Sequence, residues 1–340
     1  MIKVAAFTGG QSVPSARYRV RQMIPALEQQ GISTTEFFPA LGTYPPRKKI
    51  LRPFWAVGTL GERIPAIVRS FNYDLVWLQR EFLSTKYTLE RYTKKPRVLD
   101  VDDAIWLNSD DDFAGRLAES CELVICGNDY LANYFSQWNK NIKIIPTSVD
   151  TNKFKPAPVN DELVIGWTGT GGNFQYLYQI EPALDRVLRI FPEARLRIVS
   201  DRRPTFTSLR DAQIEYIQWS PENEVTTIQG MSIGLMPLGN SEWEKGKCSY
   251  KMLLYMACGL PVVVSPIGMN SDVLKRGQCG FAADDEGDWI EGLTSLLQDA
   301  KLRSQMGNTG RQMVLEHYSL EALAPMLSAC LKRTARSTHE

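Results

Sequence analysis

Histidine is scarce in this sequence: the 340 residues contain only His317 and His339, both near the C-terminal end. Histidine is the usual acid–base side chain near neutral pH and a common zinc ligand, so its scarcity argues against a histidine-based acid–base or zinc site. The six cysteines are scattered and lack the spacing of a metal site. We therefore expect buried, reduced thiols in a cytosolic protein.

Long apolar runs are also missing. The longest, 252–264, is interrupted by Gly259 and Pro261 and is too short to cross a bilayer. The chain begins directly with a strand-like segment, from which we expect no signal peptide. The sequence predicts a cytoplasmic protein that would meet a membrane only from the surface, as a peripheral protein on the inner face of the cytoplasmic membrane.

The formal net charge is only +1, which gives no general indication of nucleic-acid binding. The charges are nevertheless unevenly distributed along the chain. Residues 3–97 contain 16 lysines and arginines against 6 acidic residues, whereas residues 98–150 contain 3 against 10. A basic N-terminal part suggests an anionic surface or substrate on one side of the protein.

The length suits two domains, and short apolar strands alternate with helical segments in two successive series. The second series starts after 147–158, a polar stretch with two prolines that we interpret as a linker. We expect strands at IKVAAFT, STTEFF, DLVWL, RVLDV, ELVIC and IKIIP, and then at LVIGWTG, RLRIVS, IEYIQW, SIGLMPL, PVVVSP and CGFAAD. We expect helices over 17–30, 62–71, a segment between DLVWL and RVLDV, 129–138, 174–190 and 249–258, with an irregular basic stretch before 62 and further helices at the C-terminus. The alternation predicts two α/β units with doubly wound parallel sheets, whose ligands bind beyond the carboxyl ends of the strands and whose facing sides would enclose a cleft.

Gly9 and Gly10 follow the first expected strand and allow a ligand to approach the backbone closely, although a simple tight turn would use them equally well. They do not form a GxGxxG motif, so a dinucleotide cofactor is not indicated. Ser15 is in position to cap the next helix. The first turns of that helix carry Arg17, Arg19 and Arg21, whose positive charges the helix dipole disfavours. The three side chains could form a solvated face. For Arg17 we expect a contact with a ligand.

Asp100 and Asp102 lie on one face at the end of an expected strand, and Asp103 follows. Three carboxylates this close repel one another unless they are solvated, bind a cation or accept hydrogen bonds. The DxD pattern could be a divalent-metal site, but the two-domain layout does not suit one. Recognition of sugar or acceptor hydroxyls and structural capping are the other interpretations.

The stretch WTGTGGN follows the first expected strand of the second series and leads into a helix near Asn173. Its three glycines leave backbone amides accessible beside a helix N-terminus, which suits a phosphate or the edge of a sugar. A simple turn would need fewer glycines. We therefore favour a binding loop.

Lys247 and Lys251 stand at the start of an expected helix, where positive charge is unfavourable. Together with Ser249 and free amides they could form a pocket for a diphosphate. Each charge-assisted contact contributes roughly 1.5–3 kcal/mol, which outweighs the dipole penalty once the anion is bound. The alternative is that both lysines extend into solvent.

The segment KCSYKMLLYMACGLPVVVSPIGMNSDVL resembles the donor-binding block of the family 4 glycosyltransferases, retaining enzymes of GT-B fold. CELVICGNDYLANYF and IKIIPTSVDTNKFKP resemble the end of that family's first domain, with Thr147 and Ser148 in place of Asn and Gly. SARYRVRQMIPALEQQG is similar to its acceptor-side first helix. These motifs cover most of the chain in the family's order.

The resemblance implies two Rossmann-like domains, 1–150 for the acceptor and 151–317 for the donor, with 318–340 crossing back onto the first. It implies transfer of a sugar, with retention, from a UDP or GDP sugar to a hydroxyl of a glycan or lipid-linked acceptor in bacterial surface-glycan synthesis, with no cofactor and no catalytic metal. The donor-binding residues it implies are Gly9, Gly10, Trp167, Thr168, Gly169, Gly171, Gly172, Asn173, Trp219, Pro237, Ser249 and Tyr250. The acceptor-binding residues are Ser15, Arg17, Tyr18 and Asp103, and the catalytic residues are Lys247, Lys251 and Asp102.

In the mechanism implied by the resemblance, the two lysines and helix amides stabilise the departing nucleoside diphosphate. A donor phosphate oxygen helps to deprotonate the incoming hydroxyl on the same face, and Asp102 orients the sugar or the acceptor. The sequence departs from the family at several positions. The two family glutamates correspond to Gly246 and Leu254, so the carboxylate expected to bind the nucleotide ribose is missing. The family arginine corresponds to Trp167. The family histidine corresponds to Asp102 or Asp103.

The segment 44–65 combines basic and apolar residues, namely Arg47, Lys48, Lys49 and Arg52 beside Leu51, Phe54 and Trp55. This combination fits docking to anionic lipid headgroups or a lipid-diphosphate acceptor, and a solvated loop is the alternative.

Two other functions of the whole protein stay open. A nucleotide-sugar 2-epimerase of the same fold is disfavoured by the scarcity of histidine, and a non-catalytic sugar-nucleotide binding protein is made credible by the missing glutamate.

Overall fold

The computed structural model describes residues 1–158 and 162–336, which form two compact units. The first unit contains residues 1–148, the short segment 246–248 and the C-terminal part from Leu320 onward. The second contains Val149–Lys245 and Ser249–Ser319. Residues 337–340, the end of the expected C-terminal helix with His339, lie outside the described residues.

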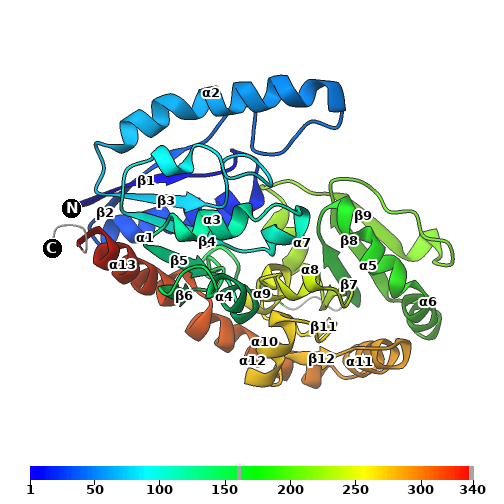
Figure 1. Cartoon of the computed structure of the whole chain (residues 1–340). Helices are drawn as coiled ribbons and strands as arrows, with labels where there is room; N and C mark the ends of the chain where they lie inside the picture. The colour runs from blue at the N-terminus through cyan, green and yellow to red at the C-terminus, as the bar shows by residue number, and fades with distance from the viewer. Residues whose placement is uncertain (159–161, 337–340) are drawn as a thin grey trace. The chain divides into compact units, whose positions relative to one another are not determined.

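The first unit is built on a six-stranded parallel sheet in the order β2-β1-β3-β4-β5-β6 (Figure 1). In the register, Val4 of β1 pairs with Thr34 of β2 and with Leu75 of β3. The order reverses between β1 and β3, the position where doubly wound sheets bind ligands. The strands are β1 (Ile2–Phe7), β2 (Ile32–Phe37), β3 (Leu75–Gln79), β4 (Arg97–Val101), β5 (Leu123–Cys126) and β6 (Ile142–Ile144).

The expected helix over 17–30 is broken into a π-helical turn η1 (Ala16–Val20), a 3-10 turn η2 (Arg21–Met23) and α1 (Ile24–Gln29). Pro25 lies in the first turn of α1, where it has no N–H to continue the preceding hydrogen-bond ladder. The other helices of this unit are η3 (Lys49–Leu51), α2 (Arg52–Ser70), η4 (Glu90–Tyr92), η5 (Ile105–Asn108), α3 (Phe113–Glu119), α4 (Asp129–Phe135) and α13 (Leu320–Arg336).

Two expectations for this unit are wrong. The basic segment before residue 62 is irregular only as far as residue 48, because η3 follows and α2 begins at Arg52 with Pro53 in its first turn. The connection between β3 and β4, whose residues are all described, is a loop with the single turn η4 in place of a helix. Its shape is fixed by the buried carboxylate of Glu90, which accepts the backbone N–H groups of Phe82 and Thr88 at 2.6 Å each.

The core of the first unit joins the sheet to the C-terminal helix. Leu323, Leu327 and Leu331 of α13 pack with buried strand residues such as Val4 and Val98. In Figure 1 this helix, in red, lies beside α1. A segment from the end of the sequence therefore completes the first unit.

The second unit contains another six-stranded parallel sheet, in the order β12-β11-β10-β7-β8-β9. Its order reverses between β7 and β10, which is the ligand-binding position of a Rossmann sheet. The strands are β7 (Val164–Thr168), β8 (Arg195–Ser200), β9 (Ile214–Gln218), β10 (Ile233–Met236), β11 (Val262–Val264) and β12 (Gly280–Ala282).

The expected helix over 174–190 is divided at Ile180, because Pro182 starts a new helix there. The helices of this unit are η6 (Gly171–Asn173), α5 (Phe174–Gln179), α6 (Glu181–Ile190), η7 (Asp211–Gln213), α7 (Glu224–Gln229), α8 (Glu242–Lys245), α9 (Tyr250–Ala257), α10 (Met269–Arg276), α11 (Glu286–Gln298) and α12 (Ala300–His317). Its core joins β7, β8 and β10 to α6 and α11 through residues such as Ile165, Leu184 and Leu293.

The predicted α/β class with two doubly wound parallel sheets is confirmed. All six cysteines are free thiols, five of them buried and Cys330 half-buried, as expected. Among the helices that the structure describes, none is both long enough and apolar enough to span a bilayer.

Candidate functional site

The glycine loop after β1 is held in place by Arg21 and Thr43. The Arg21 guanidinium donates to the carbonyls of Gly10 and Gln11 at 2.7 and 2.6 Å and pairs with Glu36 at 2.7 Å. The Gly9 carbonyl accepts both the N–H and the hydroxyl of Thr43, at 3.0 and 2.9 Å. The loop therefore has a fixed shape at the position where the order of the sheet reverses.

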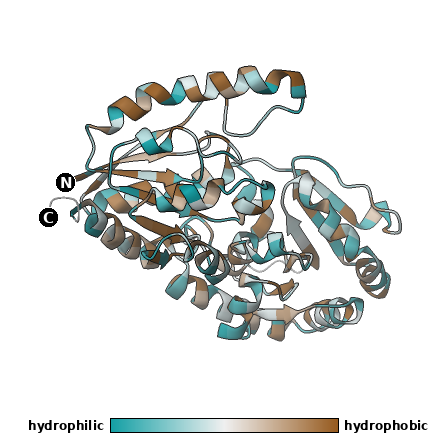
Figure 2. Ribbon diagram, in the orientation of Figure 1, coloured by the Kyte–Doolittle hydropathy of each residue, from teal (hydrophilic) through white to brown (hydrophobic). Residues whose placement is uncertain are grey.

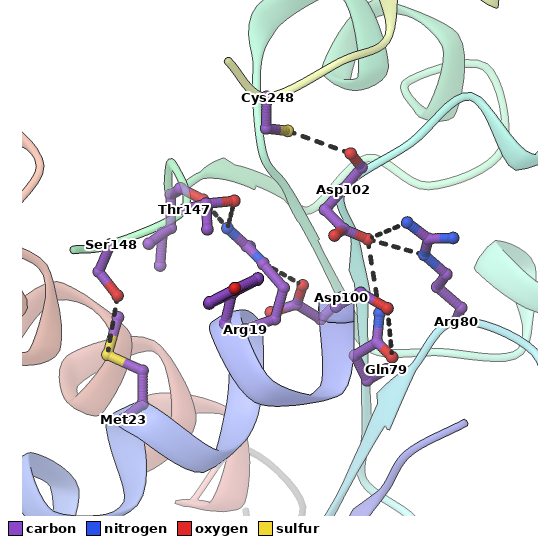
Figure 3. Close-up of polar contacts among 12 residues, drawn as sticks. Arg19, Met23, Gln79, Arg80, Asp100, Asp102, Thr147, Ser148 and Cys248 are labelled. Carbon is purple, nitrogen blue, oxygen red and sulfur yellow. Dashed lines mark hydrogen bonds and ion pairs between the residues drawn. The ribbon is translucent and has the colours of Figure 1, made fainter. Parts of the chain in front are cut away.

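Arg19 and Asp100 form a buried ion pair beneath this edge of the sheet. Arg19 Nε lies 2.8 Å from Asp100 Oδ1, and Arg19 Nη1 donates to the Ile145 carbonyl at 2.8 Å (Figure 3). Burial alone would lower the pKa of Arg19, but the charge of Asp100 raises it. With Arg19 buried and Arg21 tied to the glycine loop, the three arginines do not form the solvated face that the sequence left open.

Arg80, directly after β3, binds two of the three aspartates. Its Nε lies 2.7 Å from Asp102 Oδ1 (Figure 3). Its Nη2 lies 2.7 Å from Asp103 Oδ2. Burial would lower the pKa of Arg80, yet the charges of Asp102 and Asp103 raise it well above its usual value. Burial also raises the pKa of Asp103, with Arg80 and Lys247 opposing that rise.

The three carboxylates are therefore compensated by arginines, Asp100 by Arg19 and the other two by Arg80. Among the described residues, no group of three or more His, Cys, Asp or Glu side chains could hold a metal ion. Arg80 itself was not a candidate from the sequence. The available signal was a charged side chain immediately after a buried strand.

A cavity of about 620 Å³ opens beside this cluster in the first unit. It is lined by the glycine loop and by the loop after β2, that is by Gly10, Gln11, Ser12, Val13, Phe38, Pro39, Ala40, Gly42, Thr43 and Tyr44. Arg80 Nη1 donates to the Tyr44 hydroxyl at 3.4 Å. The cavity wall is thereby connected to the Arg80–Asp102 pair.

Three residues expected at the acceptor lie together after the glycine loop. Ser15 is buried, and its hydroxyl donates to Gln79 Oε1 at 3.4 Å instead of capping the helix, so the expected cap is wrong. Arg17 and Tyr18 are half-buried, with the guanidinium 5.0 Å from the centre of the tyrosine ring. Their contact with an acceptor stays a prediction.

The segment 246–248 packs against the strand ends of the first unit. Asn128 Nδ2 donates to the carbonyls of Gly246 and Lys247 at 3.2 and 3.1 Å, and Cys248 Sγ donates to the Asp102 carbonyl at 3.2 Å. A Cβ atom at Gly246 would lie only 2.7 Å from the Cβ of Ala104. Any side chain at position 246 would therefore displace Ala104.

Lys247 precedes helix α9, which lies within the expected range 249–258. Helix α9 begins at Tyr250, and Ser249 before it has a left-handed backbone with φ 50°. Ser249 is buried and its hydroxyl donates to Asn270 Oδ1 at 2.6 Å, so it supports the loop before α9. Leu254, where the second family glutamate is expected, is buried in the apolar side of α9.

Lys251, in the first turn of α9, lies over the end of β7 in the second unit. Its ammonium is 5.0 Å from the centre of the Trp167 ring, and a Cβ atom at Gly169 would be 2.9 Å from it. Trp167 itself is buried in the core and packs on Phe174, so the ring that Lys251 contacts is held in place. A cation and a glycine loop thus meet where the order of this sheet reverses.

The amides of the WTGTGGN loop are more occupied than the sequence suggested. Gly169 donates to the Val199 carbonyl at 3.0 Å and Gly171 to Asp201 Oδ1 at 2.5 Å. The Gly171 N–H lowers the pKa of Asp201. A carboxylate that the sequence analysis missed therefore already caps this loop, while Gly172 remains exposed.

The remaining expected donor residues surround the same sheet edge. The Thr168 N–H donates to the buried Tyr255 hydroxyl at 2.8 Å, Pro237 is buried directly after β10, and half-buried Trp219 follows β9. Asn173 Nδ2 donates to Thr170 Oγ1 at 3.1 Å. Half-buried Tyr250 opens α9.

Comparison with known proteins agrees with this layout. Residues 163–299 match the family model of glycosyl transferases group 1. No protein of curated function matches the chain by sequence.

Solved structures match the chain over almost its whole length. The sucrose-phosphate synthase of Thermosynechococcus elongatus is 15% identical with a TM-score of 0.70, covering 98% of this chain and 99% of that one. HepE of Anabaena, solved with UDP and glucose, is 12% identical with a TM-score of 0.70, covering 98% of this chain and 100% of its own. WaaG, a glycosyltransferase involved in lipopolysaccharide biosynthesis, is 12% identical with a TM-score of 0.66, covering 96% and 99%. The fold is that of the GT-B glycosyltransferases.

Proposed function

We propose that the protein is a retaining glycosyltransferase that moves a sugar from a nucleoside-diphosphate sugar to a hydroxyl of a glycan or lipid-linked acceptor. The observation that carries the proposal is the match of residues 163–299 to glycosyl transferases group 1, in the part of the chain that contains Lys251 and its glycine loop. UDP-glucose is the first donor to test, because HepE of similar fold was solved with it.

In this proposal Lys251 binds the diphosphate of the donor. Its ammonium lies over the Trp167 ring, and attraction by the ring helps to hold it at the carboxyl end of β7. Lys247 supplies a second positive charge. As charge develops on the leaving diphosphate, preorganised cations of this kind stabilise the transition state.

The acceptor would use the first unit, where the 620 Å³ cavity lies next to the Tyr44–Arg80–Asp102 chain of contacts. Asp102 would orient a hydroxyl of the sugar or acceptor through the carboxylate oxygen that Arg80 leaves available. A phosphate oxygen of the donor would take the proton of the attacking hydroxyl. In this scheme the chain needs no catalytic metal.

The test is incubation of the purified protein with a panel of UDP, GDP and ADP sugars, followed by detection of free nucleoside diphosphate and by NMR of the product. We expect one donor to be consumed, in EDTA as well as in Mg²⁺, with the anomeric configuration of the donor retained. An epimerised nucleotide sugar, or tight binding of a nucleotide sugar without any turnover, would overturn the proposal. The second outcome would point to a binding protein, which the residues Gly246 and Leu254 would suit.

A further inference from the structure

Helix α2 carries its apolar side chains on the face that points away from the protein. The outward stripe follows helical spacing of three, four or seven residues, from just before α2 to just after it, and consists of Ile50, Phe54, Val57, Ile64, Val68 and Phe71. Phe54, Val57 and Val68 are exposed to 77%, 74% and 66% of their surfaces. In Figure 2 brown segments recur along this helix between white and teal ones.

The inward face of the same helix is mostly polar, with Thr59, Arg63 and Ser70 buried there beside Ile67. The Arg63 guanidinium donates to the carbonyls of Thr8 at 2.8 Å and Phe37 at 3.3 Å. Burial lowers the pKa of Arg63 to about 10. A helix on the surface of a globular protein normally shows the opposite arrangement, with its apolar stripe toward the core.

An amphipathic surface helix usually packs its apolar face on the core. That explanation does not apply to α2, because α2 is attached to the protein through its polar face. Its contacts with the unit include hydrogen bonds from Trp55 Nε1 and Thr59 Oγ1 to the Gly42 carbonyl at 3.2 and 3.3 Å, and the Arg63 guanidinium lies 4.6 Å from the centre of the Phe82 ring. The outward apolar stripe takes no part in this attachment. A contiguous exposed apolar surface of this kind marks an interaction site.

The charges around the stripe indicate what covers it. Residues 47–71 contain five exposed basic residues and one exposed acidic residue, Glu62. The basic ones are Arg47, Lys48, Lys49, Arg52 and Arg69. Apolar side chains flanked by cations match the boundary between acyl chains and anionic headgroups, where an amphipathic helix lies in the plane of the surface.

We propose that α2 and the segment before it dock the protein on an anionic lipid bilayer, with the stripe from Ile50 to Phe71 entering the headgroup region. The proposal does not depend on the proposed transfer activity. To the basic and apolar residues named from the sequence, which run from Arg47 to Trp55, it adds the exposed apolar residues from Val57 to Phe71. Because Trp55 and Thr59 hold the Gly42 carbonyl, docking also brings the loop that lines the 620 Å³ cavity close to the bilayer.

The experiment is flotation of the full chain with vesicles of phosphatidylcholine alone and with vesicles containing 30 mol% phosphatidylglycerol. One variant carries Phe54→Ser, Val57→Ser and Val68→Ser, and its control carries Ile190→Ser, Leu315→Ser and Met326→Ser, which are also exposed. A second variant carries Arg47→Gln, Lys48→Gln and Lys49→Gln, and its control carries Lys140→Gln, Lys155→Gln and Lys301→Gln, exposed lysines with the same total charge change. Thermal unfolding of all four checks that they fold.

We expect the wild-type protein to float with the anionic vesicles, and to float much less with phosphatidylcholine alone or in high salt. Each docking variant should bind the anionic vesicles at least about tenfold more weakly, while both controls bind as the wild type does. The proposal is overturned if the wild type does not float, if it floats equally with both vesicles, or if either docking variant binds normally. A different result would assign the stripe to a second copy of the chain. In that case light scattering would show a wild-type dimer and a monomeric serine variant, and neither protein would float with vesicles.

Discussion

Arg80 and Asp102 form a pair that depends on an unusual backbone conformation. Arg80 has φ 63°, in the left-handed region, and from there its Nε reaches Asp102 Oδ1 at 2.7 Å. A non-glycine residue in this region costs on the order of 1–2 kcal/mol. The cost is offset because one guanidinium neutralises two adjacent carboxylates at the position where the order of the sheet reverses.

Replacing Arg80 by alanine should therefore destabilise the protein by about 3 kcal/mol, because Asp102 and Asp103 would be left close together without a counter-charge. Arg80→Lys keeps the charge but cannot reach both carboxylates, so its free energy of unfolding should lie between those of the wild type and the alanine variant. Urea unfolding at pH 7 measures all three. A loss below about 0.5 kcal/mol for the alanine variant would show that the two carboxylates do not need this arginine.

Ser249 offers a test of backbone strain before α9. Its left-handed backbone favours glycine, while its hydroxyl donates to buried Asn270 at 2.6 Å. Ser249→Ala and Ser249→Gly both lose this hydrogen bond, but only the glycine variant relieves the strain. We expect the glycine variant to be the more stable of the two by about 1 kcal/mol in chemical unfolding. Equal stability, or a more stable alanine variant, would mean that the strain is absent in solution.

The strands could be predicted from the sequence because most are short apolar runs between polar turns, and the central ones, such as β3, β4 and β7, are buried along their whole length. Most strand ends were placed within one or two residues, as for Val164–Thr168. The start of α2 was missed for a physical reason: its apolar residues face outward and its polar residues inward, so the pattern before Glu62 did not read as a surface helix. The helix expected between β3 and β4 failed because Glu90, a single buried carboxylate, organises that connection as a loop.

The candidate residues could be located at strand ends, but their partners could not be identified. Arg19 and Asp100 are 81 positions apart, and only the sheet order brings them together. Similarly, the sequence gave no sign that Ser249, between Lys247 and Lys251, would take a left-handed backbone. Pairings that depend on tertiary structure cannot be read from spacing.

Glu181 should make stability depend on pH. Burial would raise its pKa, but hydrogen bonds from Ser208 and Thr207, whose N–H groups lie at 2.6 and 2.5 Å, outweigh that effect and lower it. A carboxylate with a lowered folded-state pKa stabilises the protein above its unfolded-state pKa of about 4.3, and that stabilisation is lost as the pH falls through the folded-state pKa. The free energy of unfolding should thus fall more steeply on acidification in the wild type than in Glu181→Gln, as urea unfolding at pH 6 and pH 3.5 would show. Parallel pH profiles would contradict this assignment.

Lys251 should control affinity for the nucleotide if the proposed function is correct. One charge-assisted contact contributes roughly 1.5–3 kcal/mol, so Lys251→Ala should weaken UDP binding by about 10- to 100-fold in calorimetry. Lys275→Ala is the matched control, since Lys275 is an exposed lysine that pairs with Asp272 on α10 in the same unit. If Lys251→Ala binds UDP as the wild type does, the diphosphate does not lie over the Trp167 ring.

Lys247 should act mainly on turnover. Its charge helps to oppose the rise in the pKa of Asp103, and its carbonyl is held by Asn128, so the backbone at Lys247 keeps its place when the side chain is shortened. Removing a cation that stabilises the leaving diphosphate should slow turnover on the order of 10²-fold or more in Lys247→Ala. Lys247→Arg, which retains the charge, should recover part of the rate, and Lys245→Ala, at a neighbouring half-buried lysine paired with Glu242, should change little. Turnover of Lys247→Ala within about threefold of the wild type would remove this lysine from the proposed mechanism.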